Sequence, residues 1–177
     1  KKRNRRDDKA QNERITNHRN SRTGTGKKIC IKITENNIGD AGKIHSESWK
    51  ESHKSFCSEG FVARHTEEAQ TEYIRSEIAK GKDFYMLIVH IPVGIVSIYD
   101  NVIENFYIIP SEQRKGYGAI LLQYVLKQCH GIPSLWILSN NDRANAFYKK
   151  YGFIESGKKK QLRNDLFEVE LILCNEK

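Results

Sequence analysis

The sequence predicts an α/β (α+β) fold in which several strands follow one another before strand and helix alternate. Two β-type runs flank the turn sequence His90-Ile91-Pro92, and a third run ends at Pro110. A glycine-containing segment then leads into an apolar helix. A doubly wound nucleotide-binding fold would alternate strand and helix throughout, so this order of elements does not fit it.

Apolar spacing predicts the elements of the first half of the chain. Apolar residues at helical spacing from Ile38 to Trp49 predict a first helix, and residues 67–80 predict a second. Thr66 is the expected N-cap of the second helix and Gly81 its stop. Strands are expected at residues 29–33, 84–89 and 93–99.

The second half of the chain alternates strand and helix. Phe106 to Ile109 form the central strand, and the helix that begins near Gly118 has one apolar stripe. Further strands are expected at residues 135–138, 153–156 and 166–173. The last two are expected to be separated by a basic loop, Lys158-Lys159-Lys160.

The segment Gln113-Arg114-Lys115-Gly116-Tyr117-Gly118 stands where the central strand becomes a helix. Glycine lets the backbone approach a ligand closely, and the free N–H groups of a first helical turn attract an anion. Arg114 and Lys115 add positive charge. The segment is therefore a candidate phosphate site, although the same residues also suit a plain strand-to-helix turn with two solvated bases.

A second segment places Asn141-Asp142-Arg143-Ala144 ahead of Phe147-Tyr148 and Tyr151-Gly152-Phe153. Together the two segments resemble the GCN5-related N-acetyltransferase (GNAT) superfamily, whose acetyl-coenzyme A signature is Gln/Arg-x-x-Gly-x-Gly/Ala. The order of elements fits this family from about residue 29 to the end. The resemblance implies a GNAT-type fold, with a mixed, mostly antiparallel central sheet flanked by helices.

The resemblance also implies how the coenzyme binds. Backbone amides from Arg114 to Ala119 would hold the pyrophosphate, the backbone of Tyr107 to Ile109 would pair with the pantetheine arm, and the Asn141 side chain would reach the pantetheine. Acetyl-CoA is the expected co-substrate, and no metal is expected. The expected coenzyme-binding residues are Tyr107, Ile108, Ile109, Gln113, Arg114, Lys115, Gly116, Tyr117, Gly118, Ala119, Asn141 and Tyr148.

Tyr148 is the candidate proton donor for the departing thiolate. The resemblance implies that its hydroxyl points at the coenzyme's sulfur, and a phenol with a pKa of about 10 is protonated at neutral pH. By pattern alone, Tyr148 shares a helical face with Ala144, Phe147 and Tyr151 and would be a core residue. Tyr151 is the alternative donor, and backbone N–H groups near Ile108 are expected to serve the oxyanion.

Glu104 is the candidate base that deprotonates the amine. It stands near the start of the central strand, and strict alternation would place it on the same face as Phe106 and Ile108. Several members of the family use a glutamate in this region, directly or through water. The commoner alignment places that glutamate where this chain has Val102, so a solvated Glu104 and ordered water as the base remain alternatives.

The acceptor amine is expected to meet the coenzyme where the first helix and its following loop cover the central strand. Trp49, His53, Phe56 and Phe61 lie in this region, with Glu104 beneath them. These side chains would form an aromatic, mildly polar pocket, or they would pack the end of the helix as ordinary core residues.

The charge of the chain is concentrated at its amino-terminal end. Residues 1–28 hold 11 Lys and Arg against 3 Asp and Glu, whereas residues 29–177 hold 19 of each sign. Residues 1–28 therefore read as a basic, flexible arm, and residues 29–177 as a single acetyltransferase domain. The balanced domain makes no case for a nucleic-acid surface, so nucleic acid is expected at most as a weak partner of the arm.

The remaining composition fits an enzyme of the cytoplasm. Four cysteines are scattered without a Cys-x-x-Cys pair, and the six histidines show no metal spacing. No hydrophobic signal or membrane span is visible. The expected function is acetyl transfer to a primary amine of a small molecule or protein, and family analogy suggests a homodimer. A non-catalytic acyl-CoA-binding module and nucleic-acid binding through the arm are the alternatives.

Overall fold

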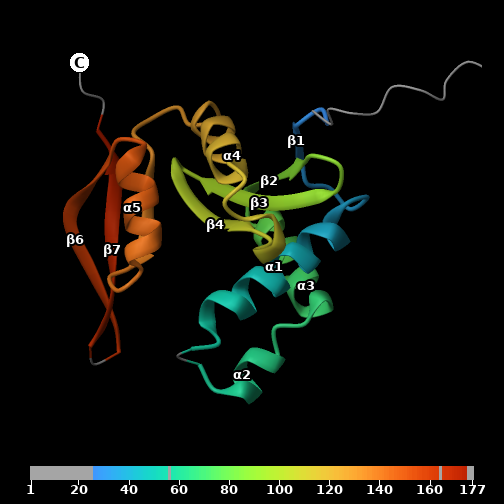
Figure 1. The fold of residues 1–177 in the computed structure, drawn as a ribbon, viewed down its shortest axis with the longest axis horizontal. Helices are drawn as coiled ribbons and strands as arrows, with labels where there is room; N and C mark the ends of the chain where they lie inside the picture. Colours follow the sequence, from blue (N-terminus) through green and yellow to red (C-terminus); the bar gives the residue numbers. More distant parts are fainter. Residues whose placement is uncertain (1–25, 56, 164, 175–177) are drawn as a thin grey trace, which may run out of the picture.

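The computed structural model describes residues 26–55, 57–163 and 165–174, which form a seven-stranded sheet with helices on both faces (Figure 1). In their order across the sheet, the strands are β1 (Ile29–Lys32), β2 (Asp83–Ile88), β3 (Pro92–Tyr99), β4 (Val102–Ile108), β5 (Ser134–Leu138), β7 (Leu166–Leu173) and β6 (Phe153–Arg163). Every neighbouring pair is antiparallel except β4 and β5, which run parallel. The predicted mixed, mostly antiparallel sheet is confirmed.

The helices agree with the sequence pattern except for one that it did not predict. They are α1 (Ile38–His53), α2 (Glu59–Ala63), α3 (Glu67–Ala79), the 3-10 turn η1 (Pro110–Glu112), α4 (Tyr117–Leu126) and α5 (Asp142–Lys150). As predicted, Thr66 caps α3 by accepting a hydrogen bond from the Ala69 N–H at 3.2 Å, and Gly81 follows the helix with φ +96°. The unpredicted helix is α2, whose five residues are too few for a periodic signal. None of the helices in the described residues is long and apolar enough to cross a membrane.

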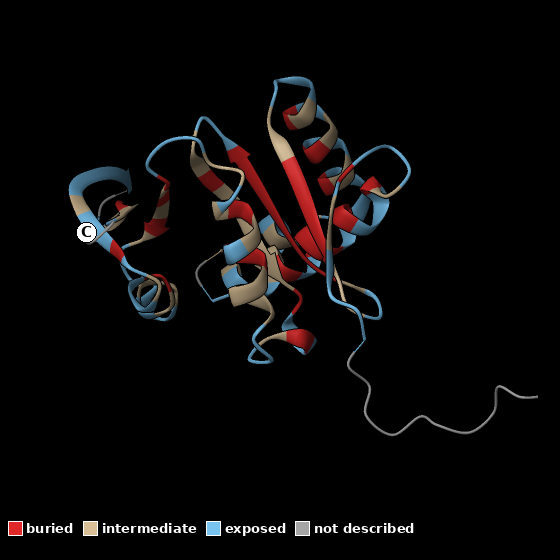
Figure 2. Ribbon diagram, turned by 90° about the horizontal axis from the view of Figure 1, so that it is seen from above, coloured by how far each residue is buried: buried red, intermediate tan, exposed pale blue. Residues whose placement is uncertain are grey.

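Each face of the sheet buries its own apolar cluster (Figure 2). On the α1/α3 face, the cluster contains Ile44 of α1, Ile74 of α3 and Ile95 of β3. On the α4/α5 face, it contains Leu121 and Leu122 of α4 and Tyr148 of α5. A residue of β4 that packs in one of these clusters therefore faces the helices that belong to the same cluster.

The sheet opens between its two parallel strands. Val102 and Ile103 of β4 pair with Ser134 and Leu135 of β5, and the pairing ends there. By contrast, β5 pairs with β7 along its whole length. The edge of β4 beyond Ile103 therefore has backbone donors and acceptors that no described strand of the β5 side pairs, and it is open to an added strand.

Strand β4 also contains a β-bulge, which corrects the predicted orientation of Glu104. Ser97 of β3 pairs with Glu104, and Ile95 pairs with Tyr107, so two residues of β4, Asn105 and Phe106, stand opposite one residue of β3. Asn105 has φ +47°. The extra residue resets the alternation, so Glu104 lies on the α1/α3 face, not on the face of Phe106.

The segment predicted as a basic loop is part of a strand. Lys159 and Lys160 pair with Val169 and Glu168 of β7, within the long strand β6. Because β6 is the last strand of the sheet, its lysines leave charge on an edge that would otherwise pair with another chain. The predicted basic arm lies outside the described residues except for residues 26–28.

Candidate active site

The loop between β4 and α4 has the backbone geometry of an anion site. Arg114 and Gly116 both have positive φ, +63° and +83°, and Gly116 is the N-cap of α4. No side chain caps this helix, so the N–H groups of its first turn remain available to a ligand. A Cβ atom on Gly116 would meet no atom within 4 Å, so the space above the loop is open.

Side chains around the loop fix its ends and add positive charge. The Gln113 side-chain amide donates to the Ile108 carbonyl at 2.9 Å, which ties the loop to the end of β4. The Lys115 ammonium lies 2.9 Å from the buried Glu112 carboxylate, and the Lys28 ammonium lies 5.7 Å from the centre of the Tyr117 ring. A Cβ on Gly118 would lie 3.4 Å from the Phe147 ring, an ordinary packing distance, so α4 and α5 approach each other here.

Helix α5 carries Tyr148 toward the open edge of β4. Asn141 caps the helix by accepting a hydrogen bond from the Ala144 N–H at 3.0 Å. The Tyr148 ring meets the Phe106 ring of β4 edge to face, with 6.0 Å between centroids. Burial raises the pKa of Tyr148 above its ordinary value, and the nearby Tyr107 adds to the rise. The hydroxyl is therefore protonated at neutral pH, as a proton donor must be.

Glu104 lies in a chain of charges on the α1/α3 face. The Lys82 ammonium pairs with the Glu104 carboxylate and also lies 2.6 Å from the Glu77 carboxylate. Burial opposes the charge of Lys82, but hydrogen bonds to Glu104 and Glu77 raise its pKa above the ordinary value. An acceptor amine that used Glu104 as its base would therefore compete with Lys82 for the carboxylate.

A polar cluster that the sequence did not predict surrounds the bulge. The Asn105 side chain donates to the Ser97 hydroxyl at 2.9 Å and accepts from His45 Nε2 at 3.2 Å and from the Tyr73 hydroxyl at 3.4 Å. His45 and Ser97 are almost fully buried, at 4% and 0% exposure. These residues come from α1, α3, β3 and β4, and no local sequence signal connects them.

His45 is neutral in this cluster. Burial lowers its pKa to about 4, although the hydrogen bond to Asn105 acts in the opposite direction. With Nε2–H donating to Asn105, Nδ1 carries the lone pair, and this atom is buried without a hydrogen-bond partner among the described residues. A proton on Nδ1 would have no acceptor, so the neutral ring fits its site.

Comparisons with known proteins agree with this geometry. A sequence model of the Acetyltransferase (GNAT) domain matches residues 50–169. The chain belongs to the GNAT acetyltransferase family. A comparison with curated proteins finds no match.

Solved GNAT structures share the fold. An acetyltransferase of the GNAT family from Bacillus cereus is 17% identical, with a TM-score of 0.64 over 83% of this chain and 96% of that one. The PaiA N-acetyltransferase of Thermoplasma acidophilum, solved with coenzyme A, is 21% identical, with a TM-score of 0.59 over 81% and 98% of the two chains. The ribosomal-protein-S18-alanine N-acetyltransferase of Escherichia coli is 14% identical, with a TM-score of 0.60 over 83% and 93%.

Most of the aromatic residues predicted for the acceptor pocket form a stack beside α1. The Trp49 indole lies parallel to the His53 ring at 3.9 Å and to the His65 ring at 3.4 Å, and Phe61 approaches it at 5.8 Å. Two parallel rings this close to Trp49 must cover opposite faces of the indole. The pKa of His53 is lowered, mainly because the ring is partly buried. Phe56, the remaining predicted residue, lies outside the described residues.

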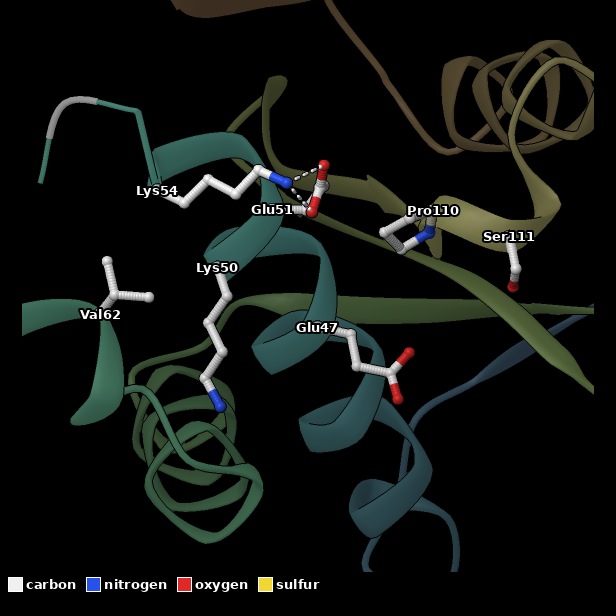
Figure 3. Close-up of a pocket in the computed structure, with 7 residues that line it drawn as sticks. All are labelled: Glu47, Lys50, Glu51, Lys54, Val62, Pro110 and Ser111. Carbon is white, nitrogen blue, oxygen red and sulfur yellow. Dashed lines mark hydrogen bonds and ion pairs between the residues drawn. The ribbon is translucent and has the colours of Figure 1, made fainter. Parts of the chain in front are cut away.

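A hollow of about 440 Å³ lies between α1, α2 and η1 (Figure 3). Its lining residues are Glu47, Lys50, Glu51, Lys54, Val62, Pro110 and Ser111. Glu51 and Lys54 pair with each other at 2.7 Å. None of the predicted site residues lines this hollow, and two acids with two bases select neither an anion nor a cation. The predicted coenzyme-binding segments lie instead along β4 and the loop that leads to α4.

The structure thus brings together most of the predicted coenzyme residues. Tyr107 to Ile109 lie at the open end of β4, and residues 113–119 continue from it through η1 into α4. Tyr148 reaches this edge through Phe106. Glu104 and Trp49 lie on the other face of the sheet. Among the described residues, no three His, Cys, Asp or Glu side chains gather as a metal site.

Proposed function

We propose that the protein is an acetyl-CoA-dependent N-acetyltransferase that transfers an acetyl group to a primary amine of a small molecule or protein. One observation carries the proposal: the unpaired edge of β4 runs directly into the uncapped N-terminus of α4. An edge suits the amides of a pantetheine arm, and a helix N-terminus suits a pyrophosphate. Coenzyme A carries these two groups one after the other.

In this proposal the loop and β4 bind the coenzyme and orient it. Backbone amides from Arg114 to Ala119 hold the pyrophosphate, with Gln113 fixing the loop to β4. Tyr107 to Ile109 pair with the pantetheine arm as an added strand would, and Asn141 reaches the arm from the start of α5. The thioester then lies near Phe106 and Tyr148, at the level of the bulge.

Transfer proceeds by direct attack of the neutral amine on the thioester carbon. The C–N bond forms, the C–S bond breaks, and the amine proton passes to the base, either Glu104 or ordered water. The Tyr148 hydroxyl gives a proton to the departing thiolate, and backbone N–H groups of β4 stabilise the carbonyl oxygen as it gains charge. The open gap between β4 and β5 allows the acceptor to approach from the α1/α3 face.

A turnover screen tests the proposal. The protein is mixed with acetyl-CoA and a library of small amines and peptides, and released thiol and acetylated product are both measured. We expect amine-dependent release of coenzyme A with one acetylated product for each thiol. Binding of acetyl-CoA without transfer to any amine would instead support a non-catalytic acyl-CoA-binding module.

A further inference from the structure

We propose that Asn105 is a positioning residue: held by His45, Ser97 and Tyr73, it fixes the β4 bulge so that the backbone of Asn105 and Phe106 meets the acetyl group. This inference rests on the proposed function, because the acetyl group must come from bound acetyl-CoA. It assigns a role to four side chains that have no part in the proposed coenzyme binding or proton transfer.

The position of the bulge is the first argument. Asn105 and Phe106 have no register partner on β3, and β4 pairs with β5 only as far as Ile103. On the side of β5, the backbone groups of this segment therefore have no strand partner among the described residues. Phe106 touches the Tyr148 ring, so these groups lie at the level of the predicted proton donor. Backbone N–H groups aimed at a developing oxyanion contribute strongly to catalysis only when their geometry is fixed.

The hydrogen bonds of Asn105 are the second argument. Its amide donates to Ser97, and its carbonyl oxygen accepts from both His45 and Tyr73. Asparagine tolerates positive φ better than most residues, but an isolated one would not be confined to φ +47°. Three anchors from three different elements hold the residue in this conformation.

Burial of two of the anchors is the third argument. The His45 ring meets the Tyr107 ring edge to face at 4.9 Å, and Ser97 has no exposed surface. Polar side chains are costly to bury, and apolar residues would pack these positions without that cost. Ser97 and His45 instead satisfy Asn105, which lies on the part of β4 that β5 does not pair.

The test compares Asn105, in the middle of β4, with Asn101, which directly precedes the strand. Asn105→Gly removes the anchored side chain while allowing the same φ. Asn101→Gly is the matched control, because Asn101 also has positive φ, +66°, and its side chain accepts from the N–H groups of His130 and Gly131, both at 2.8 Å. For each variant we would measure thermal unfolding, coenzyme A affinity, kcat, and the infrared carbonyl band of bound ¹³C-labelled acetyl-CoA.

We expect Asn105→Gly to lower kcat by about 100-fold with little change in coenzyme A affinity, as loss of one oxyanion donor does. Its carbonyl band should shift toward that of a less polarised thioester. Asn101→Gly should lower the melting temperature but leave kcat and the band unchanged. Equal loss of kcat in both variants, or a wild-type band and kcat in Asn105→Gly, would overturn the assignment.

Two milder variants apply if Asn105→Gly does not fold. Tyr73→Phe and Ser97→Ala each remove one hydrogen bond to Asn105, and each should lower kcat several-fold and shift the band part of the way. No effect from either would overturn the positioning role. Because the band needs no acceptor, a shift in the variants supports positioning even before an acceptor is known. A wild-type protein that fails to bind acetyl-CoA would overturn the proposed function, and the positioning role with it.

Discussion

Burial keeps both Tyr148 and His45 neutral, although it moves their pKa values in opposite directions. A low-dielectric site disfavours the charged form, which is the anion of a phenol and the cation of an imidazole. The pKa of Tyr148 is therefore raised and that of His45 lowered. Tyr148 keeps the proton that it would donate, and His45 keeps a hydrogen bond to Asn105 without introducing a buried charge.

His45 makes stability depend on pH. Its pKa falls from 6.5 to about 4 on folding, so between these values the unfolded chain binds a proton that the folded protein excludes. Above pH 6.5 the neutral His45 makes its full contribution to the free energy of unfolding. As the pH falls toward 4, the free energy of unfolding decreases by about 3 kcal/mol at most. Urea unfolding of wild type and His45→Gln across this range measures it. Equal pH slopes in the two proteins would contradict the prediction.

Tyr148→Phe tests proton delivery to the thiolate. The ring and its contacts with Phe106 and Phe153 remain, and only the hydroxyl is lost. We expect kcat to fall about 100-fold, within the usual contribution of general acid catalysis, with coenzyme A affinity unchanged. Steady-state kinetics and calorimetric titration measure the two quantities. Wild-type kcat in this variant would favour proton delivery by water, and Tyr151→Phe serves as the comparison.

Glu104→Gln tests the base. If Glu104 deprotonates the amine, turnover should fall, most strongly below the pKa of the acceptor, where more of the amine is protonated. The pH–rate profile of the variant measures this effect. A profile identical to that of wild type would remove Glu104 from the mechanism and leave ordered water as the base. Its ion pair with Lys82 would then be structural.

At the level of helices and strands, the site depends on how β4 ends. The strand loses its partner beyond Ile103, bulges at Asn105, and continues through η1 into α4. In the proposed function, the first feature leaves an edge for the coenzyme arm, and the last leaves uncapped N–H groups for its phosphates. The geometry thus belongs to one continuous segment, which is why a short motif could indicate it.

Gly116→Glu should weaken coenzyme binding strongly, by placing bulk and negative charge at the pyrophosphate site. Gly157→Glu is a matched control, because Gly157 has φ +88° and equally open space but lies in β6. Both variants should lose similar stability, and only Gly116→Glu should lose affinity for coenzyme A in calorimetric titration. Unchanged affinity in folded Gly116→Glu protein would contradict the loop assignment.

Elements with a local signal were predictable from sequence, and irregular ones were not. Thr66 and Gly81 marked the ends of α3, because caps are short-range chemistry. The bulge at Asn105 depends on pairing with β3, so strict alternation placed Glu104 on the wrong face. The lysines of β6 looked like a loop, because charge hides a strand pattern at a sheet edge.

Across the whole molecule, the strand edge and the loop of the proposed coenzyme site were predictable, and the side-chain clusters on the α1/α3 face were not. In the proposal, phosphate and pantetheine bind through backbone groups, and the positions of these groups follow from the glycine loop and the strand order. The cluster of His45, Tyr73, Ser97 and Asn105 depends on the folded arrangement of four elements. The Trp49 stack likewise needs His65, which lies beyond α2 in the chain. Clusters assembled from several elements in this way have no single-segment signature.

A thermal-shift titration with acetyl-CoA, coenzyme A and ATP tests the coenzyme site most directly. A ligand that binds only the folded protein raises its melting temperature, by an amount that grows with affinity and concentration. Both coenzymes should raise the melting temperature and ATP should not, because ATP lacks the pantetheine arm that pairs with β4. No shift with either coenzyme, or an equal shift with ATP, would contradict coenzyme binding along β4 and the α4 loop.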